Sequence, residues 1–343
     1  YEVATYTQND GMQPGSLYAD ATIYHPIGYN DVLGSIILGA GHGGDQESME
    51  NWAYYFSSYG FVSATIQYND PDMDSHGFRA EAILELITSI KMEQDRISSP
   101  LYNALDTNEF AAVGYSLSGG SVQLAAVLNS SLSAVIALNP TIITEDCELC
   151  ADSEYCICLV PEFLDHSVPT LIIAGQNEVI ELPNYDGFLG QDQYYNTPET
   201  TTKLLYEISG GGHSSTEWPG ASEAIPSRLA LNWLRYFIQN KEEYCDSVLV
   251  VPENASQFIT TLNCELGPPP PPPTQNVGYL RETEGFFCMD DCSNYFLESE
   301  NGEFLSYVAN QNGIPNFEYF IDRFVEIDGD RIQCVECSAV NVE

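Results

Sequence analysis

The chain has 343 residues, and its content of 44% apolar and 12% aromatic side chains is sufficient for a packed globular core. Fifty acidic residues against ten basic ones give a formal net charge of −40 at pH 7. Such a charge repels nucleic-acid phosphates and anionic lipid headgroups, so we expect neither nucleic acid nor a membrane as a partner. The acidic residues are spread along the chain, which favours a solvated, salt-tolerant surface over a binding patch.

The cysteines and the start of the chain indicate an exported protein. No run approaches the ~18 consecutive apolar residues of a membrane span, and the chain begins at Tyr1 without a signal-like segment, which predicts a mature or trimmed product. The ten cysteines fall into local groups: Cys147, Cys150, Cys156 and Cys158; Cys245 and Cys264; Cys288, Cys292, Cys334 and Cys337. An even number in such groups favours disulfides, and we therefore expect a secreted, extracellular protein.

Short apolar runs alternate with helical stretches through most of the chain. We expect buried strands at 35–38, 61–66, 110–113, 134–138, 170–174 and 204–208. Between the second and third runs, Ile83, Ile87 and Ile90 share one helical face, which predicts a core helix over 79–90. This alternation is typical of an α/β domain with a mostly parallel central sheet covered by helices on both faces.

A change in composition marks the end of this domain. Gly267 is followed by six consecutive prolines, which predict a stiff, extended spacer of ~3 Å per residue. After it, alternating stretches at 319–327 and turn signals such as Asn301-Gly302 favour a small antiparallel β barrel or sandwich. We therefore expect three parts: a large α/β domain at 1–266, a proline-rich linker at 267–277 and a small β-rich accessory domain at 278–343.

The sequence from Gly114 to Gly119 approximates the motif Gly-x-Ser-x-Gly, with Ser118 at the second glycine. It follows a predicted strand and precedes the helical run 122–128, and strand, turn and helix are the context in which this motif holds the nucleophile of an α/β-hydrolase. The alternative interpretation is a plain tight turn. In the hydrolase interpretation Ser116 is the nucleophile and the Leu117 N–H faces the developing oxyanion.

A serine nucleophile needs a general base, and the chain has five histidines. His213 follows the last predicted strand and a run of three glycines that allows it to reach the sheet edge, so we predict it as the base. The α/β-hydrolase order of serine, acid and histidine places the acid after strand 170–174, which selects Glu178, with Glu181 and Asp186 as rivals. The second oxyanion amide is assigned to His42, in the glycine loop after strand 35–38, and its imidazole ring is predicted to line the cleft.

Several segments resemble the actinobacterial cutinase and polyethylene-terephthalate hydrolase family over most of the large domain. They are Ser58-Tyr59-Gly60-Phe61-Val62, Ser98-Ser99-Pro100-Leu101-Tyr102 with Asp106-Thr107, Gly211-Gly212-His213-Ser214, and Asn232-Trp233-Leu234-Arg235-Tyr236-Phe237. The resemblance implies an α/β-hydrolase fold and a disulfide between Cys245 and Cys264.

Carried over by position, the resemblance implies a triad of Ser116, Glu178 and His213, with the His42 and Leu117 amides as the oxyanion hole. Substrate contacts are assigned to His42, Leu117, Thr141 and Ile180. The sequence departs from the family at His42, where an aromatic residue is usual, at Ser118, at Glu178 in place of aspartate, and at Thr141 in place of a cleft tryptophan.

Two cysteine groups leave alternatives open. The insertion from Cys147 to Cys158 follows a predicted strand at the carboxyl edge of the sheet, so it either walls the cleft or forms a disulfide-pinned surface loop. Cys288, Cys292, Cys334 and Cys337 have spacings that suit either a structural zinc site or two disulfides, and export favours disulfides.

These features predict a serine carboxylic-ester hydrolase that acts through an acyl-enzyme, and the resemblance implies short-chain acyl esters and polyesters as its substrates. Serine catalysis requires no metal or organic cofactor, and we expect a monomer whose partner is its ester substrate. A feruloyl or lipase-like esterase is an alternative specificity, because specificity depends on cleft shape. A non-catalytic binding protein on a hydrolase scaffold is the alternative from another class.

Overall fold

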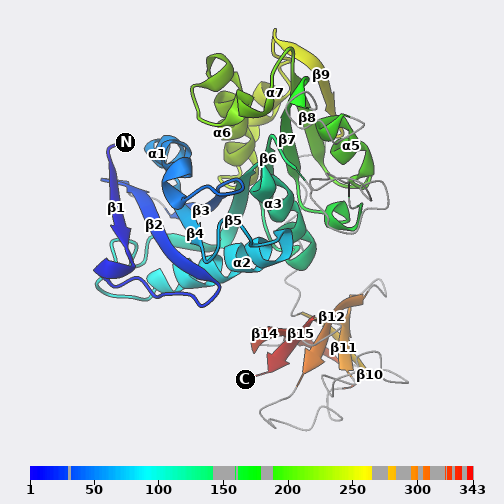
Figure 1. Ribbon diagram of the computed structural model, residues 1–343. Helices are drawn as coiled ribbons and strands as arrows, with labels where there is room; N and C mark the ends of the chain where they lie inside the picture. Colours follow the sequence, from blue (N-terminus) through cyan, green and yellow to red (C-terminus); the bar gives the residue numbers. More distant parts are fainter. Residues whose placement is uncertain are drawn as a thin grey trace. The chain divides into compact units, whose positions relative to one another are not determined.

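The computed structural model describes residues 1–29, 32–141, 159, 161–178, 188–264, 277–282, 295–299, 304–309, 321, 323–326, 329–333 and 338–342. Contacts divide the chain into two compact units, Tyr1–Pro269 and Pro270–Glu343. The first unit contains every helix labelled in Figure 1.

The first unit is built on a nine-stranded sheet with the order β1-β2-β4-β3-β5-β6-β7-β8-β9. Its strands are β1 Val3–Thr7, β2 Tyr18–Pro26, β3 Leu33–Gly39, β4 Val62–Tyr68, β5 Leu105–Tyr115, β6 Ala134–Leu138, β7 Thr170–Gly175, β8 Lys203–Ile208 and β9 Ala255–Thr260. The six strands from β4 to β8 pair in parallel, whereas β1, β2 and β9 add antiparallel edges. The predicted α/β-hydrolase fold with a mostly parallel sheet is confirmed.

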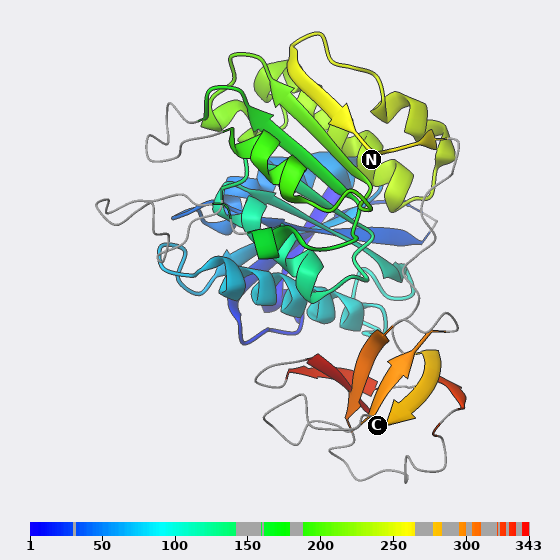
Figure 2. The same ribbon diagram turned by 90° about the vertical axis from the view of Figure 1, so that its right-hand side faces the viewer.

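Helices cover both faces of this sheet (Figures 1 and 2). They are α1 Glu50–Ser58, α2 His76–Glu93, α3 Leu117–Leu128, α5 Leu189–Asn196, α6 Ile225–Phe237 and the short α7 Cys245–Val248. Successive strand residues point to opposite faces. In β3, Ile36 and Leu38 therefore pack with α1 and α6, while Ile37 packs with α2 and α3. The two cores that result hold the central strands rigidly, so the loops at their carboxyl ends are well supported.

The predicted strands and helices of the large unit are present. Each of the six apolar runs lies in a parallel strand of the sheet, and the isoleucine face of 79–90 is buried in α2. A disulfide links Cys245 at the start of α7 to Cys264 just beyond β9, so the pairing implied by the family resemblance is confirmed. No helix within the described ranges has the length and apolar character needed to cross a membrane.

The second unit is β-rich. Its described strands form one sheet in the order β13-β10-β11-β12-β15-β14: β10 Val277–Glu282, β11 Tyr295–Glu298, β12 Phe304–Ala309, β13 Phe324–Glu326, β14 Gly329–Gln333 and β15 Ser338–Val342. Four pairs are antiparallel, but β12 and β15 pair in parallel. The expectation of a wholly antiparallel module is wrong at this pair. The prolines 268–273 and the cysteines 288, 292, 334 and 337 lie outside the described residues.

Candidate active site

Ser116 lies at the sharp turn between β5 and α3. Its backbone has φ 52° and ψ −118°, a conformation that non-glycine residues rarely adopt and that marks strained functional turns. The turn is possible because its neighbours are small: a Cβ on Gly114 would lie 2.0 Å from the Ser118 carbonyl oxygen, and one on Gly119 would lie 2.7 Å from Pro140 Cα. The turn therefore places the Ser116 hydroxyl at the amino end of α3.

His213 is brought over this turn by the loop after β8. It begins the short 3-10 helix η5 His213–Thr216, and its Nε2 atom lies 2.8 Å from Ser116 Oγ. The hydroxyl of Tyr115 donates to the His213 carbonyl oxygen at 2.9 Å, and the two rings are 5.4 Å apart. The His213 side chain is 20% exposed, so it remains accessible from solvent while its backbone is fixed.

Glu178 follows β7 and approaches the other side of the imidazole. Its Oε2 atom lies 3.2 Å from His213 Nδ1, and its side chain is only 2% exposed. The second carboxylate oxygen, Oε1, accepts the Gly175 N–H at 2.6 Å. A buried carboxylate in this position selects the tautomer in which Nδ1 carries the proton and Nε2 faces the serine.

Asn139 holds the acid and the histidine loop together, a role that sequence reasoning did not find. Its Nδ2 atom donates to Glu178 Oε1 at 2.6 Å and to the Gly212 carbonyl oxygen at 3.3 Å. Its Oδ1 atom accepts the hydroxyl of Thr216. Asn139 is fully buried with φ 42°, and asparagine is among the few residues enriched in this left-handed region. The Asn-Pro pair directly after a predicted strand was the available sequence signal.

The glycine loop after β3 lies against the nucleophile. A Cβ on Gly41 would lie 3.0 Å from Ser116 Cβ, so a side chain there would push the loop and the nucleophile apart by a few tenths of an ångström. The N–H groups of His42 and Leu117 have no hydrogen-bond acceptor among the residues that the structure describes. Both amides are therefore available to bind an oxygen anion, and the His42 side chain is exposed.

Of the remaining predicted site residues, only Thr141 lies within the described part of the chain. Thr141 is 3% exposed; its N–H donates to the Ser116 carbonyl oxygen at 3.0 Å, so its backbone supports the turn. Ile180, the rival acids Glu181 and Asp186, and the insertion from Cys147 to Cys158 lie outside the described residues.

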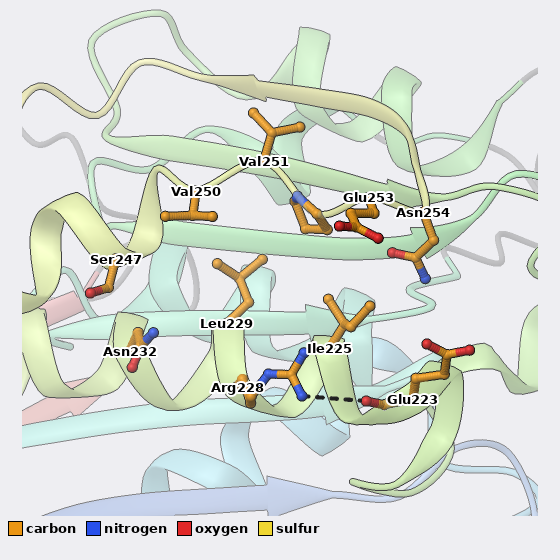
Figure 3. A pocket seen from close by; sticks show the side chains of 11 residues that line it. Glu223, Ile225, Arg228, Leu229, Asn232, Ser247, Val250, Val251, Glu253 and Asn254 are labelled. Atoms are coloured by element: carbon orange, nitrogen blue, oxygen red, sulfur yellow. Dashed lines mark hydrogen bonds between the residues drawn. The ribbon is translucent and has the colours of Figure 1, made fainter.

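A separate hollow of about 570 Å³ lies between α6 and the segment that leads into β9 (Figure 3). Ile225, Leu229, Val250 and Val251 contribute apolar side chains to its lining, and Arg228 on the α6 side reaches towards Glu223. None of the residues around Ser116 lines it, so the hollow is distinct from the candidate site.

The arrangement around Ser116 has parts that acyl transfer requires: a hydroxyl next to an imidazole, a carboxylate behind the imidazole, and amides at Leu117 and in the adjacent glycine loop that have no acceptor among the described residues. The sequence model of the PET hydrolase-like family matches residues 4–264. Cutinase est2 of Thermobifida alba is 25% identical over 228 residues, which is 66% of this chain and 67% of the relative.

Two further relatives agree. Cutinase 1 of Thermobifida cellulosilytica is 24% identical over 69% of this chain and 80% of its own length. The bis(hydroxyethyl) terephthalate hydrolase of Streptomyces coelicolor is 25% identical over 66% of this chain and 64% of its own length. The chain therefore belongs to the PET hydrolase-like family and is a carboxylic ester hydrolase.

Proposed function

We propose that the chain hydrolyses carboxylic esters through an acyl-enzyme formed on Ser116. The observation that carries the proposal is the 2.8 Å approach of His213 Nε2 to Ser116 Oγ, with Glu178 on the opposite ring nitrogen. A serine hydroxyl is a weak nucleophile, and a neutral imidazole at this distance is the base that activates it.

In the proposed reaction, Ser116 Oγ attacks the ester carbonyl carbon while His213 Nε2 takes its proton. The carbonyl oxygen becomes an anion, which the His42 and Leu117 amides bind. Collapse of this intermediate breaks the bond to the alcohol, which leaves with the proton from His213. Water then attacks the acyl-enzyme by the same route and releases the acid.

We propose short-chain acyl esters and polyesters as the substrates. Support comes from the names of the relatives, two cutinases and a bis(hydroxyethyl) terephthalate hydrolase. Trp218 is 55% exposed and lies only five positions beyond His213 in the chain, so it is a candidate for contact with an apolar or aromatic acyl group.

We further propose that residues 1–266 form the catalytic domain of a secreted enzyme, joined by the linker 267–277 to an accessory domain at 278–343. The candidate catalytic residues all lie in the first compact unit, and the division between units falls within the proline run. The Cys245–Cys264 disulfide supports export, because such bonds persist mainly in oxidising compartments.

Hydrolysis of p-nitrophenyl butyrate and of a polyester film by the wild type and by Ser116→Ala tests the proposal. We expect Ser116→Ala to lose at least a thousandfold in kcat on the soluble ester and to release no product from the film. Circular dichroism checks that the variant is folded. If the folded variant keeps the wild-type rate, or if the wild type hydrolyses no ester, a binding protein on a hydrolase scaffold is the better account.

A further inference from the structure

A buried arginine lies directly beneath the glycine loop of the site. Arg79, on α2, is 0% exposed, and its guanidinium lies 4.2 Å from the centre of the Tyr68 ring. Its Nη1 atom donates to the carbonyl oxygens of Ala40 at 2.8 Å and Gly41 at 3.3 Å. Its other donors reach the Pro71 carbonyl oxygen at 2.6 Å and the Asp74 carbonyl oxygen at 3.1 Å.

The acceptors around Arg79 are uncharged. Within the described residues, no carboxylate lies within ion-pair distance of the guanidinium. Burial lowers the pKa of Arg79 from its ordinary value, and the nearby Tyr68 and Asp74 oppose the shift. Guanidinium still stays protonated in proteins, so a positive charge is held at this point by hydrogen bonds to neutral acceptors, with Asp72 and Asp74 nearby.

The bonds to the loop carbonyls set the direction of the proposed oxyanion donor. The Gly41 carbonyl and the His42 N–H belong to the same peptide group, and in a trans peptide these two groups point in opposite directions. The Gly44 N–H donates to the same Gly41 oxygen at 3.1 Å, so Arg79 and Gly44 together hold this oxygen, and the His42 N–H points to the opposite side of the peptide. A hydrogen bond from a cation also polarises the peptide and makes its N–H a stronger donor.

Ser118 connects this arginine to the nucleophile turn. Its hydroxyl donates to the Ala40 carbonyl oxygen and lies 3.2 Å from Arg79 Nη1, whose two N–H groups are shared among the Ala40, Gly41 and Ser118 oxygens. Tyr68 Oη lies 2.9 Å from Ser118 Oγ, and because the one Ser118 proton is already used, Tyr68 is the donor there. The Ser118 hydroxyl thus donates one hydrogen bond and has Tyr68 and the shared Arg79 N–H groups as its donors.

Gly39 leaves the space that the Ser118 side chain occupies. A Cβ on Gly39 would lie 2.9 Å from Ser118 Cβ and 2.4 Å from Tyr68 Oη, so the absence of a side chain at Gly39 admits the Ser118 side chain. Ser118 stands where the motif has its second glycine, and its burial is complete. The departure from the motif therefore adds a polar contact that glycine lacks.

We propose that Arg79 and Ser118 are positioning residues for ester hydrolysis, which hold the Ala40–Gly41 carbonyls so that the His42 amide faces the oxyanion. The inference rests on the proposed function, because it assigns the support of one of its oxyanion donors. Neither side chain touches the substrate; both act through the loop.

Ser118→Ala tests the proposal with the smallest change. Removing an oxyanion donor costs about 10²–10³ in kcat, and loosening one is expected to cost less, roughly tenfold, with KM within about twofold. The affinity for a boronic acid that forms a tetrahedral adduct on Ser116 should fall by the same factor as kcat, because the adduct carries the same oxygen. Active-site titration with a fluorophosphonate removes any effect of inactive protein from kcat.

Ser89→Ala is the matched control. Ser89 is also a buried serine that bonds a tyrosine hydroxyl, Tyr18 at 2.8 Å, but it lies far along α2 from the loop. We expect it to lower stability to a similar extent and to leave kcat and boronic-acid affinity at wild-type values.

Tyr68→Phe is a second test of the proposal if Ser118→Ala does not fold. It removes only the hydroxyl that donates to Ser118. We expect kcat to fall roughly threefold with KM unchanged. The inference is overturned if kcat and boronic-acid affinity stay at wild-type values in whichever variant folds, while Ser116→Ala remains inactive. Retained activity in Ser116→Ala would instead overturn the proposed function.

Discussion

On one side of Ser116 the buried carboxylate of Glu178 backs the imidazole of His213, whereas on the other side the buried guanidinium of Arg79 backs the loop that carries the His42 amide. The Glu178 side chain is 2% exposed and Arg79 is 0% exposed. Both charges are held by neutral partners, an amide and a backbone N–H for Glu178 and carbonyl oxygens for Arg79.

In the proposed reaction, Glu178 faces a developing positive charge and Arg79 faces a developing negative charge. The two buried charges differ in sign for this reason. A positive imidazolium develops at His213, next to the anion, and a negative oxygen develops at the loop, on the side of the cation. Charges that are fixed before the reaction need no rearrangement when the transition state forms. Loss of either one should therefore lower kcat more than it raises KM.

Glu178→Gln should give the largest effect on the anionic side. Glutamine keeps the size of the side chain but removes the charge that stabilises the imidazolium, and we expect kcat for p-nitrophenyl butyrate to fall by roughly 10³ or more. Glu207→Gln is the matched control, since Glu207 is a buried, hydrogen-bonded glutamate at the end of β8 without a bond to His213. A loss of kcat below tenfold in Glu178→Gln would contradict the assignment of Glu178 as the acid.

Asn139→Gly should have an intermediate effect. Glycine accepts the φ of 42° at this position, so the change removes the side chain without straining the backbone. Glu178 and the Gly212 loop then lose their common donor, and we expect kcat to fall about ten- to a hundredfold with KM nearly constant. Asn103→Gly, at an exposed asparagine with φ 56°, is the control and should leave kcat unchanged. Equal kcat in the two variants would show that Asn139 does not position the acid.

His76→Gln tests the surroundings of Arg79 through the pH dependence of stability. Burial lowers the pKa of His76 to about 4, the charge of Arg79 adds to this shift, and the hydrogen bond to the Thr141 carbonyl oxygen opposes it. In the unfolded chain the pKa is about 6.5, so between about pH 6.5 and 4 the unfolded state binds more protons. The contribution to stability is complete above pH 6.5 and is lost as the pH falls through this window.

The expected loss from His76 is about 2 kcal/mol at pH 5. Guanidinium unfolding at pH 7.5 and pH 5 should therefore show a smaller decline in His76→Gln than in the wild type. Part of the decline should remain, because burial also lowers the pKa of His166 to about 4. His42→Gln, with its exposed side chain, should follow the wild type. Parallel pH dependences of His76→Gln and wild type would contradict this assignment.

The sequence was most informative where one local pattern was enough. Mostly apolar runs predicted the parallel strands, because a strand buried on both faces is apolar at most of its positions. The edge strands β1, β2 and β9 mix polar and apolar residues and were not predicted, and in the small unit only the paired register shows that β12 and β15 run parallel.

The site residues also differ in whether a local sequence pattern predicts them. Ser116 and His213 each carry a local signal, a glycine-flanked turn and a glycine run after a strand, and the fold brings them together with Glu178. Asn139 carries only the Asn-Pro pair after a predicted strand and Arg79 carries none, because their partners lie far away in the sequence: Asn139 bonds Glu178 and Gly212, and Arg79 bonds Ala40 and Gly41. Such contacts depend on which loops the sheet order places side by side.

Rapid quenching of the wild type during turnover of p-nitrophenyl butyrate, followed by peptide mass spectrometry, tests the central claim most directly. The account predicts one butyryl group on the peptide that contains Ser116, present during turnover and lost when the substrate is exhausted. A burst of p-nitrophenol of about one equivalent per active site should accompany it if release of the acid is the slower step. Steady turnover with butyryl found on another residue, and never on Ser116, would contradict the account.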